Sequence, residues 1–264
     1  MGKNVVITGS TRGIGFAMAC EFLKAGCNVS ISGRQQTLAD DKHEILKALA
    51  GKYIYIPCNV QDKKSLQELW DLSAEKWGKV DIWINNAGQN APYKFAWETE
   101  ENYTYNVIQT NITGTIFGSQ IAAVGMLKQK HGAIYSMEGL GSNDMIQLKT
   151  ILYGTTKRAL TYFMNGLAKE LEGSGVIAGR LSPGMMLTDF ITKDPDGNAS
   201  EVITQENFKR IFNILADRPE TVAAFFVPQI LANTKNGKQI AWLTKRKALS
   251  RFLAAPFSKR KLLQ

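Results

Sequence analysis

The first apolar segment of the chain runs directly into a glycine-rich turn, and this junction limits the possible folds more than any other feature. Val5–Thr8 is predicted to be a buried strand, and an amphipathic helix is expected to begin at residue 13. Gly9, Gly13 and Gly15 allow a tight turn and a close approach to a pyrophosphate, which binds the N–H groups at a helix start. We therefore predict a dinucleotide at this turn. An ordinary strand-to-helix turn is the alternative.

Strand and helix patterns alternate along the whole chain. Further strands are predicted at 28–32, 53–57, 80–85, 133–137, 176–181 and 239–243. Helices are predicted at 13–25, 36–50, 62–77, 101–130, 152–173 and 204–233. Most of the strands are apolar throughout, as expected when both faces of a sheet are covered. We predict the α/β class: a single-domain, doubly wound Rossmann fold with a parallel sheet of about seven strands and helices on both faces.

Composition is that of a globular protein in a reducing compartment. The chain is 44% hydrophobic and 21% charged, and its three cysteines lack metal-ligand spacing. Its two histidines argue against a histidine-based metal site. The first residues show no signal-peptide pattern, and the uncharged stretch 102–127 is too polar to span a membrane. We therefore expect a cytoplasmic protein.

The formal charge of +9 is concentrated at one end of the chain. Residues 245–264 contain seven Lys and Arg and no acidic residue, whereas the other 244 residues carry 25 basic and 23 acidic side chains. We predict a domain at 1–244 followed by a basic tail. Because the tail also contains Leu and Phe, it is predicted to contact an anionic membrane, unless it is a solvated tail or a subunit-contact arm. No nucleic-acid-binding motif accompanies the charge.

Four more motifs follow the glycine turn. They are Asn85-Asn86-Ala87-Gly88, Asn111 within Thr-Asn-Ile-Thr-Gly, Tyr153 four residues before Lys157, and Ser182-Pro183-Gly184 with Thr188. Together with the turn, and in this order over about residues 4–243, they resemble the short-chain dehydrogenase/reductase family. The resemblance implies an enzyme that interconverts a carbonyl and an alcohol with a nicotinamide cofactor, assembled as a homodimer or homotetramer.

The resemblance also implies the cofactor contacts. These are Gly9, Ser10, Thr11, Arg12, Gly13, Ile14, Gly15, Arg34, Asn59, Val60, Asn86, Ala87, Gly88, Tyr153, Lys157, Pro183, Gly184 and Thr188. A carboxylate at the end of the second strand would bind the ribose of NAD, but Ser32-Gly33-Arg34 stands there instead. Arg34 and Arg12 are expected to bind the 2′-phosphate of NADP, unless both are ordinary solvated side chains. We predict NADP(H), with NAD(H) as the alternative.

Tyr153 and Lys157 share one helix face because they are four residues apart. The resemblance makes Tyr153 the proton donor and acceptor, gives Lys157 a tuning and positioning role, and assigns the proton relay to Asn111. A nearby ammonium is expected to lower the tyrosine pKa from about 10. The serine usual in the family is missing, because Gly139 stands near its place. Ser142 is predicted to replace it.

Residues 132–189 are similar to the chlorophyll b reductase branch of the family, which reduces a formyl group on a tetrapyrrole. Glu138 at the mouth of the site is predicted to contact substrate or to cap its loop. The apolar segment 185–218 is predicted to be a lid over a bulky or hydrophobic substrate, although helix packing explains its composition equally well. The alternative function is a non-catalytic NADP(H)-binding regulatory protein, which the missing serine favours and the intact Asn111, Tyr153 and Lys157 oppose.

Overall fold

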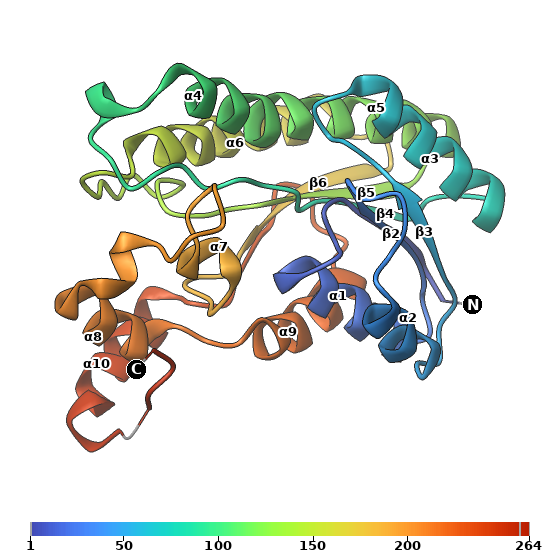
Figure 1. The fold of residues 1–264 in the computed structure, drawn as a ribbon. Coiled ribbons are helices and arrows are strands. Elements are labelled where there is room, and N and C mark those ends of the chain that lie inside the picture. Colours follow the sequence, from blue (N-terminus) through green and yellow to red (C-terminus); the bar gives the residue numbers. More distant parts are fainter. Residues whose placement is uncertain (1, 259, 264) are drawn as a thin grey trace.

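The computed structural model describes residues 2–258 and 260–263. Its centre is a parallel seven-stranded sheet in the order β3-β2-β1-β4-β5-β6-β7 (Figure 1). The strands are β1 (Asn4–Ile7), β2 (Asn28–Gly33), β3 (Tyr53–Pro57), β4 (Ile82–Asn85), β5 (Gly132–Met137), β6 (Val176–Ser182) and β7 (Gln239–Ala241). The central strand β1 pairs in parallel with both β2 and β4, so that Val5 lies opposite Val29 on one side and Ile82 on the other. The predicted doubly wound fold is confirmed.

Helices cover both faces of this sheet. The α-helices of the chain are α1 (Gly13–Lys24), α2 (Asp40–Lys47), α3 (Lys63–Trp77), α4 (Glu101–Ile108), α5 (Gly114–Gln129), α6 (Ile151–Glu170), α7 (Asp189–Thr192), α8 (Glu206–Leu215), α9 (Pro219–Leu231) and α10 (Lys245–Ala254). One face is covered by α3, α4, α5 and α6, and the other by α1, α2 and α9 (Figure 1). Because helices cover both faces, the central strands β1 and β4 are buried at every position and are mostly apolar.

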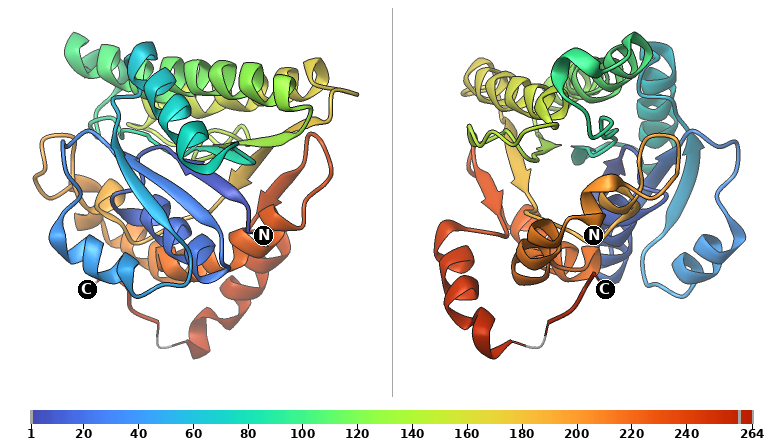
Figure 2. Two further views of the ribbon diagram at one scale, coloured as in Figure 1. Left: turned by 90° about the vertical axis from the view of Figure 1, so that its right-hand side faces the viewer. Right: turned by 60° about the vertical axis from the view of Figure 1, so that its left-hand side comes forward.

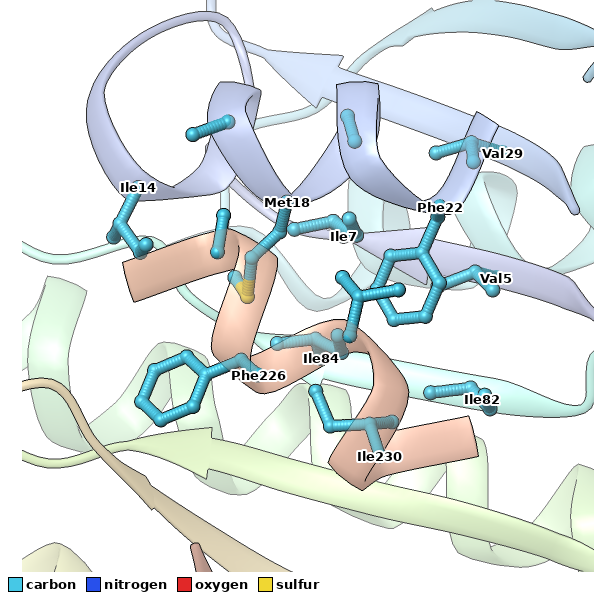
Figure 3. Close-up of a cluster of buried hydrophobic side chains, with 14 of the residues drawn as sticks. Val5, Ile7, Ile14, Met18, Phe22, Val29, Ile82, Ile84, Phe226 and Ile230 are labelled. Atoms are coloured by element: carbon cyan, nitrogen blue, oxygen red, sulfur yellow. The ribbon is translucent and has the colours of Figure 1, made fainter. Parts of the chain in front are cut away.

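The two faces have separate cores. On the first, Met18 and Phe22 of α1 lie one turn apart and pack with Phe226 and Ile230 of α9 against β1 and β4 (Figure 3). On the second, Trp70 of α3 lies against Trp83 of β4, with ring centroids 6.1 Å apart. These cores hold the carboxyl ends of β1, β4, β5 and β6 in fixed positions, which is where ligands bind in open α/β sheets.

The prediction of a single helix over 204–233 is wrong. The segment forms α8 and α9, separated at residues 216–218. Arg218 precedes a proline, which disfavours helical backbone, and it is extended with ψ 146°. The backbone of Asp217 instead bonds to Met185 and Leu187, so the break is also tied to the loop after β6.

The predicted helix at 101–130 is nearly continuous, but a π-helical turn at Gln109–Thr113 separates α4 from α5. Such wide turns are rare and frequently occur at functional sites. Asn111 lies in the middle of this one.

The basic tail contains a helix that was not assigned from the sequence. The Thr244 hydroxyl caps it by accepting a hydrogen bond from the Lys247 N–H. This helix, α10, lies next to α8 at the periphery of the molecule (Figures 1 and 2). Within the described part of the chain, no helix is long and apolar enough to cross a membrane.

Candidate active site

The glycine turn after β1 and the loop after β4 are joined into one surface. The Thr8 hydroxyl accepts hydrogen bonds from the N–H groups of Asn86 (3.0 Å) and Ala87 (3.1 Å), and the Asn86 amide donates back to the carbonyls of Thr8 and Gly9. Gly9 has a φ of +61°, and a Cβ there would lie 2.8 Å from the Ala87 Cα. Only glycine therefore allows this close approach.

The turn has the shape and the free groups that a pyrophosphate requires. Gly13, where α1 begins, has a φ of +57°, and no side chain caps this helix start. The Thr188 methyl lies 3.6 Å from the place where a Gly13 Cβ would be, so the loop from Pro183 through Gly184 to Thr188 lies beside the turn. An open helix N-terminus next to left-handed glycines fits a dinucleotide pyrophosphate.

Some of the predicted cofactor residues build this surface, and others border it. Ser10 is buried, and its hydroxyl donates to the Ile7 carbonyl (2.7 Å) while it accepts from the Ser32 N–H (3.0 Å). Ile14 and Val60 are buried apolar side chains of the two cores. Ser10 therefore supports the turn from behind, whereas Ile14 and Val60 contribute to the cores.

The polar residues at the border are more exposed. Arg34 and Asn59 are exposed just after β2 and β3, and Thr11 contacts Gly33 at the end of β2. The Arg12 side chain, which was predicted to bind a cofactor phosphate, here forms an ion pair with Asp189 of α7 (3.7 Å). The turn is thereby linked to the segment predicted to be the lid.

Asn111 is completely buried and holds two loops together. Its Oδ1 accepts from the Gln89 N–H (2.8 Å), and its Nδ2 donates to the Gln89 carbonyl (2.9 Å) and to the Thr156 hydroxyl (3.1 Å). Thr156 is on α6, between Tyr153 and Lys157. The π turn thus connects the loop after β4 to the helix with the predicted proton-transfer pair.

Tyr153 and Lys157 lie one turn apart on α6, with the Lys157 ammonium 5.7 Å from the centre of the tyrosine ring. Lys157 Nζ donates to the Met137 carbonyl at the end of β5 (2.9 Å). Burial raises the pKa of Tyr153, which is opposite to the shift expected from the nearby cation. Burial lowers the pKa of Lys157 to about 8, and Glu138 partly opposes this change.

Gly139, near the place of the usual serine, packs directly against Tyr153. A Cβ at this position would collide with the Tyr153 hydroxyl and lie 3.2 Å from the Lys157 Cγ. Ser142, the predicted replacement, is buried, and its hydroxyl accepts from the Gly139 N–H (3.2 Å) and donates to the Lys157 carbonyl (3.4 Å). In this conformation Ser142 shapes the loop beside Tyr153, because its hydroxyl is already bonded to backbone.

The buried Glu138 belongs to a polar network that sequence reasoning did not find. Its carboxylate accepts from Arg180 of β6 (2.9 Å) and from Gln239 of β7 (2.6 Å). The network ties the residue that follows β5 to Arg180 within β6 and to the first residue of β7, next to the carbonyl that receives Lys157. Of the two roles predicted for Glu138, the described contacts are those of a group that holds its loop. Its partners lie 42 and 101 residues away, so no local sequence signal reveals them.

The 185–218 segment reaches the tyrosine through Phe190 of α7. The Phe190 ring meets the Tyr153 ring edge to face, with centroids 5.5 Å apart. The Phe190 carbonyl accepts from the side chain of Asn90, in the loop after β4 (2.9 Å). In addition, the Tyr103 hydroxyl of α4 donates to Asp196. The segment therefore lies over the site, and Phe190 contacts its central side chain.

A fold of this topology, with a glycine cradle and a Tyr–Lys–Asn centre, is that of a nicotinamide-dependent oxidoreductase. Residues 3–199 match the short chain dehydrogenase family. This chain belongs to the short-chain dehydrogenase/reductase family and is an oxidoreductase acting on CH–OH or C=O groups.

Several relatives are similar over most of the chain. Chlorophyll(ide) b reductase NOL of Oryza sativa subsp. japonica, described as chloroplastic, is 37% identical over 262 residues, which span 95% of this chain and 74% of the relative. Glucose 1-dehydrogenase 2 of Bacillus subtilis is 28% identical over 84% of this chain and 85% of the relative. A structure of ElxO with NADP bound is 27% identical, with a TM-score of 0.78 over 91% of this chain and 97% of that structure.

Proposed function

We propose that the protein is an NADP(H)-dependent oxidoreductase that interconverts a carbonyl and an alcohol on a bulky, apolar, tetrapyrrole-like substrate. The observation that carries the reaction is the placement of Tyr153, Lys157 and Asn111 beside the glycine cradle, at one edge of the sheet. Gly9 through Gly15, with Thr188 beside them, would hold the pyrophosphate. A bound nicotinamide would supply or accept the hydride.

Tyr153 moves the proton at its Oη. Because burial raises its pKa, the hydroxyl keeps its proton in the conformation described and is ready to donate it to a carbonyl oxygen. Lys157 lies on the same face of α6 as Tyr153, and its hydrogen bond to the Met137 carbonyl fixes its position. Its positive charge favours the phenolate form of Tyr153 once the proton has left. Asn111 holds the loop after β4 against α6, so that the cradle and the tyrosine keep their relative positions.

Removal of the Tyr153 hydroxyl tests this reaction. Tyr153→Phe is expected to lower turnover of any accepted carbonyl by about 10²- to 10⁴-fold, the usual contribution of a general acid. NADPH affinity, followed by fluorescence titration, should remain. Tyr162→Phe on the same helix is the matched control, because this side chain is exposed and should leave turnover unchanged. Equal turnover by the two variants would contradict the assignment.

The preference for NADP(H) is supported by the end of β2. Arg34 is exposed there, and none of the three residues at positions 32–34 is acidic, so no carboxylate from them would repel a 2′-phosphate. Arg34→Asp should weaken NADPH binding far more than NADH binding, because an attractive contact becomes repulsive. Lys169→Asp makes the same charge change on an exposed residue at the end of α6 and is the control. An unchanged NADPH/NADH ratio in Arg34→Asp would remove Arg34 from the site.

The substrate class is supported by the relatives and by the apolar lid. Chlorophyll(ide) b reductases align with at least 94% of this chain at 32–37% identity. Phe190 also offers an aromatic surface next to Tyr153. The test is NADPH oxidation with a formyl tetrapyrrole and with small aldehydes and ketones. Faster turnover of the tetrapyrrole supports the proposal, and preference for small carbonyls contradicts it.

One observation favours a second candidate, a non-catalytic NADP(H)-binding regulatory protein. Gly139 stands near the place of the usual serine, and the Ser142 hydroxyl is bonded to backbone. Tight NADPH binding with no turnover across the whole carbonyl panel would support this candidate. A cytoplasmic location and a homodimeric or homotetrameric assembly stay predictions.

A further inference from the structure

The C-terminal helix α10 has one face fixed to the protein. Arg251 binds Asp217 through both guanidinium nitrogens (2.7 and 3.1 Å) and donates to the Leu215 carbonyl at the end of α8 (2.7 Å). Arg260, beyond the helix, also binds Asp217 (2.9 Å), and Lys247 lies over the Trp242 ring. Three of the seven tail cations therefore point toward the body of the protein.

The opposite face of α10 is apolar and exposed. Leu249, Phe252 and Leu253 are 62%, 44% and 70% exposed, and Phe257 in the following turn is 90% exposed. At about 100° per residue, Leu249, Phe252 and Leu253 lie within one stripe, opposite the arm of Arg251. Lys245 and Arg246, both exposed, begin the helix along the same side.

The two faces together have the composition of a helix that lies at a lipid surface. We propose that this outer face of α10, together with Phe257, docks on an anionic bilayer surface. The apolar side chains would enter the boundary between headgroups and acyl chains while Lys245 and Arg246 pair with lipid phosphates. The ion pairs of Arg251 hold the helix with its apolar stripe outward before contact, so little ordering remains to be done on binding.

Charge argues against a second copy of the chain as the occupant. Residues 245–264 contain no Asp or Glu, so a two-fold contact through this stripe would bring cations against cations. An anionic membrane supplies the opposite charge over an extended plane. Because α10 lies against α8, docking would bring the lid segment near the membrane. The proposal does not depend on the reaction that the enzyme catalyses.

The test is co-sedimentation of the full chain with vesicles of equal parts phosphatidylcholine and phosphatidylglycerol, compared with phosphatidylcholine alone. We expect binding to the anionic vesicles at low salt and its loss at about 0.5 M salt, where the Debye length falls to a few ångströms. Lys245→Gln with Arg246→Gln should weaken binding by about thirtyfold. Leu249→Ser, Phe252→Ser and Leu253→Ser together should weaken it at least about tenfold.

Ile45→Ser with Leu72→Ser is the matched control, because these exposed apolar residues lie on α2 and α3 and should leave binding unchanged. Circular dichroism checks that each variant is folded. Absence of binding to anionic vesicles at low salt, or binding that the α10 variants do not weaken, would overturn the proposal. A change in molar mass by light scattering, with vesicle binding unaffected, would show that a second copy covers this face instead.

Discussion

The cofactor side and the lid side of the site are built by different means. On the cofactor side, glycines at close approach and hydrogen bonds from Thr8 and Asn86 join the loops after β1 and β4. On the lid side, separate segments are held by charged side chains, chiefly the pairing of Asp217 with Arg251 and Arg260. Backbone contacts require particular residues at particular spacings, whereas ion pairs only require that two distant side chains meet.

This difference explains why the two sides are unequally recognisable and predicts that they fail independently. The cofactor side depends on steric limits that hold in any protein of this fold. The lid side depends on ion pairs between side chains that are far apart in the sequence, and the exposed Arg12–Asp189 pair adds only a weak link between the two sides. Substitutions on one side should therefore leave the function of the other largely intact.

Removal of the Asp217 carboxylate should have the largest effect on stability. Asp217 is buried, and Asp217→Ala leaves the partly buried Arg251 without its partner, so we expect a loss of about 3 kcal/mol in the free energy of unfolding. In kinetics, the KM for substrate should rise while NADPH affinity is kept. Glu44→Ala, which breaks an exposed ion pair on α2, should leave the denaturation curve unchanged. Equal curves for the two variants would show that the tail does not stabilise the lid.

The stabilisation that the Asp217–Arg251 pair provides should depend on pH. Burial alone would raise the pKa of Asp217, but hydrogen bonds from Arg251 and Trp242 hold it below its usual value. A carboxyl group whose pKa is lowered by folding stabilises the protein above its unfolded pKa of about 3.9, and this contribution is lost as the pH falls through the folded value. The difference in stability between wild type and Asp217→Ala should therefore be constant near neutral pH and shrink below about pH 4.

Gly9→Ala should damage the cofactor side alone. Its left-handed φ and the contact with Ala87 leave no room for a methyl group, so we expect a loss of about 1–3 kcal/mol in stability and much weaker NADPH binding. Gly166→Ala is the control, because this glycine lies inside α6 with open space around it and should stabilise by about 0.5–1 kcal/mol. Normal NADPH binding by Gly9→Ala would contradict the close approach of the two loops.

Glu138→Gln should have the smallest effect on activity among these variants, and the effect should be seen in the pH dependence. Burial lowers the pKa of Lys157 to about 8 and the Glu138 charge opposes this, so loss of that charge next to Arg180 should lower the pKa further. The ammonium is then lost at lower pH, and the alkaline limb of kcat/KM should move down by roughly half a unit. Glu170→Gln, an exposed change at the end of α6, should leave the limb in place. A limb that stays at its wild-type position in Glu138→Gln would mean that the network only holds the strands.

The sequence by itself determined the parts that depend on local geometry. Apolar runs and helical spacing predicted all seven strands to within a few residues, because a strand buried on both faces needs apolar side chains at every position. The glycine spacing predicted the turn before α1, and the four-residue interval placed Tyr153 and Lys157 on one helix face. In each case the physical constraint acts between residues that are neighbours in the chain.

Only the tertiary structure decided the contacts between distant residues. Gly139 packs against the Tyr153 hydroxyl, and Glu138 binds Arg180 and Gln239 on the two neighbouring strands. For the basic tail, the sequence left a membrane contact, a solvated tail and a subunit arm open, because charge alone does not reveal that Arg251 turns inward to Asp217. Such pairings depend on how the sheet and helices bring remote side chains together, and no periodicity or spacing along the chain encodes that meeting.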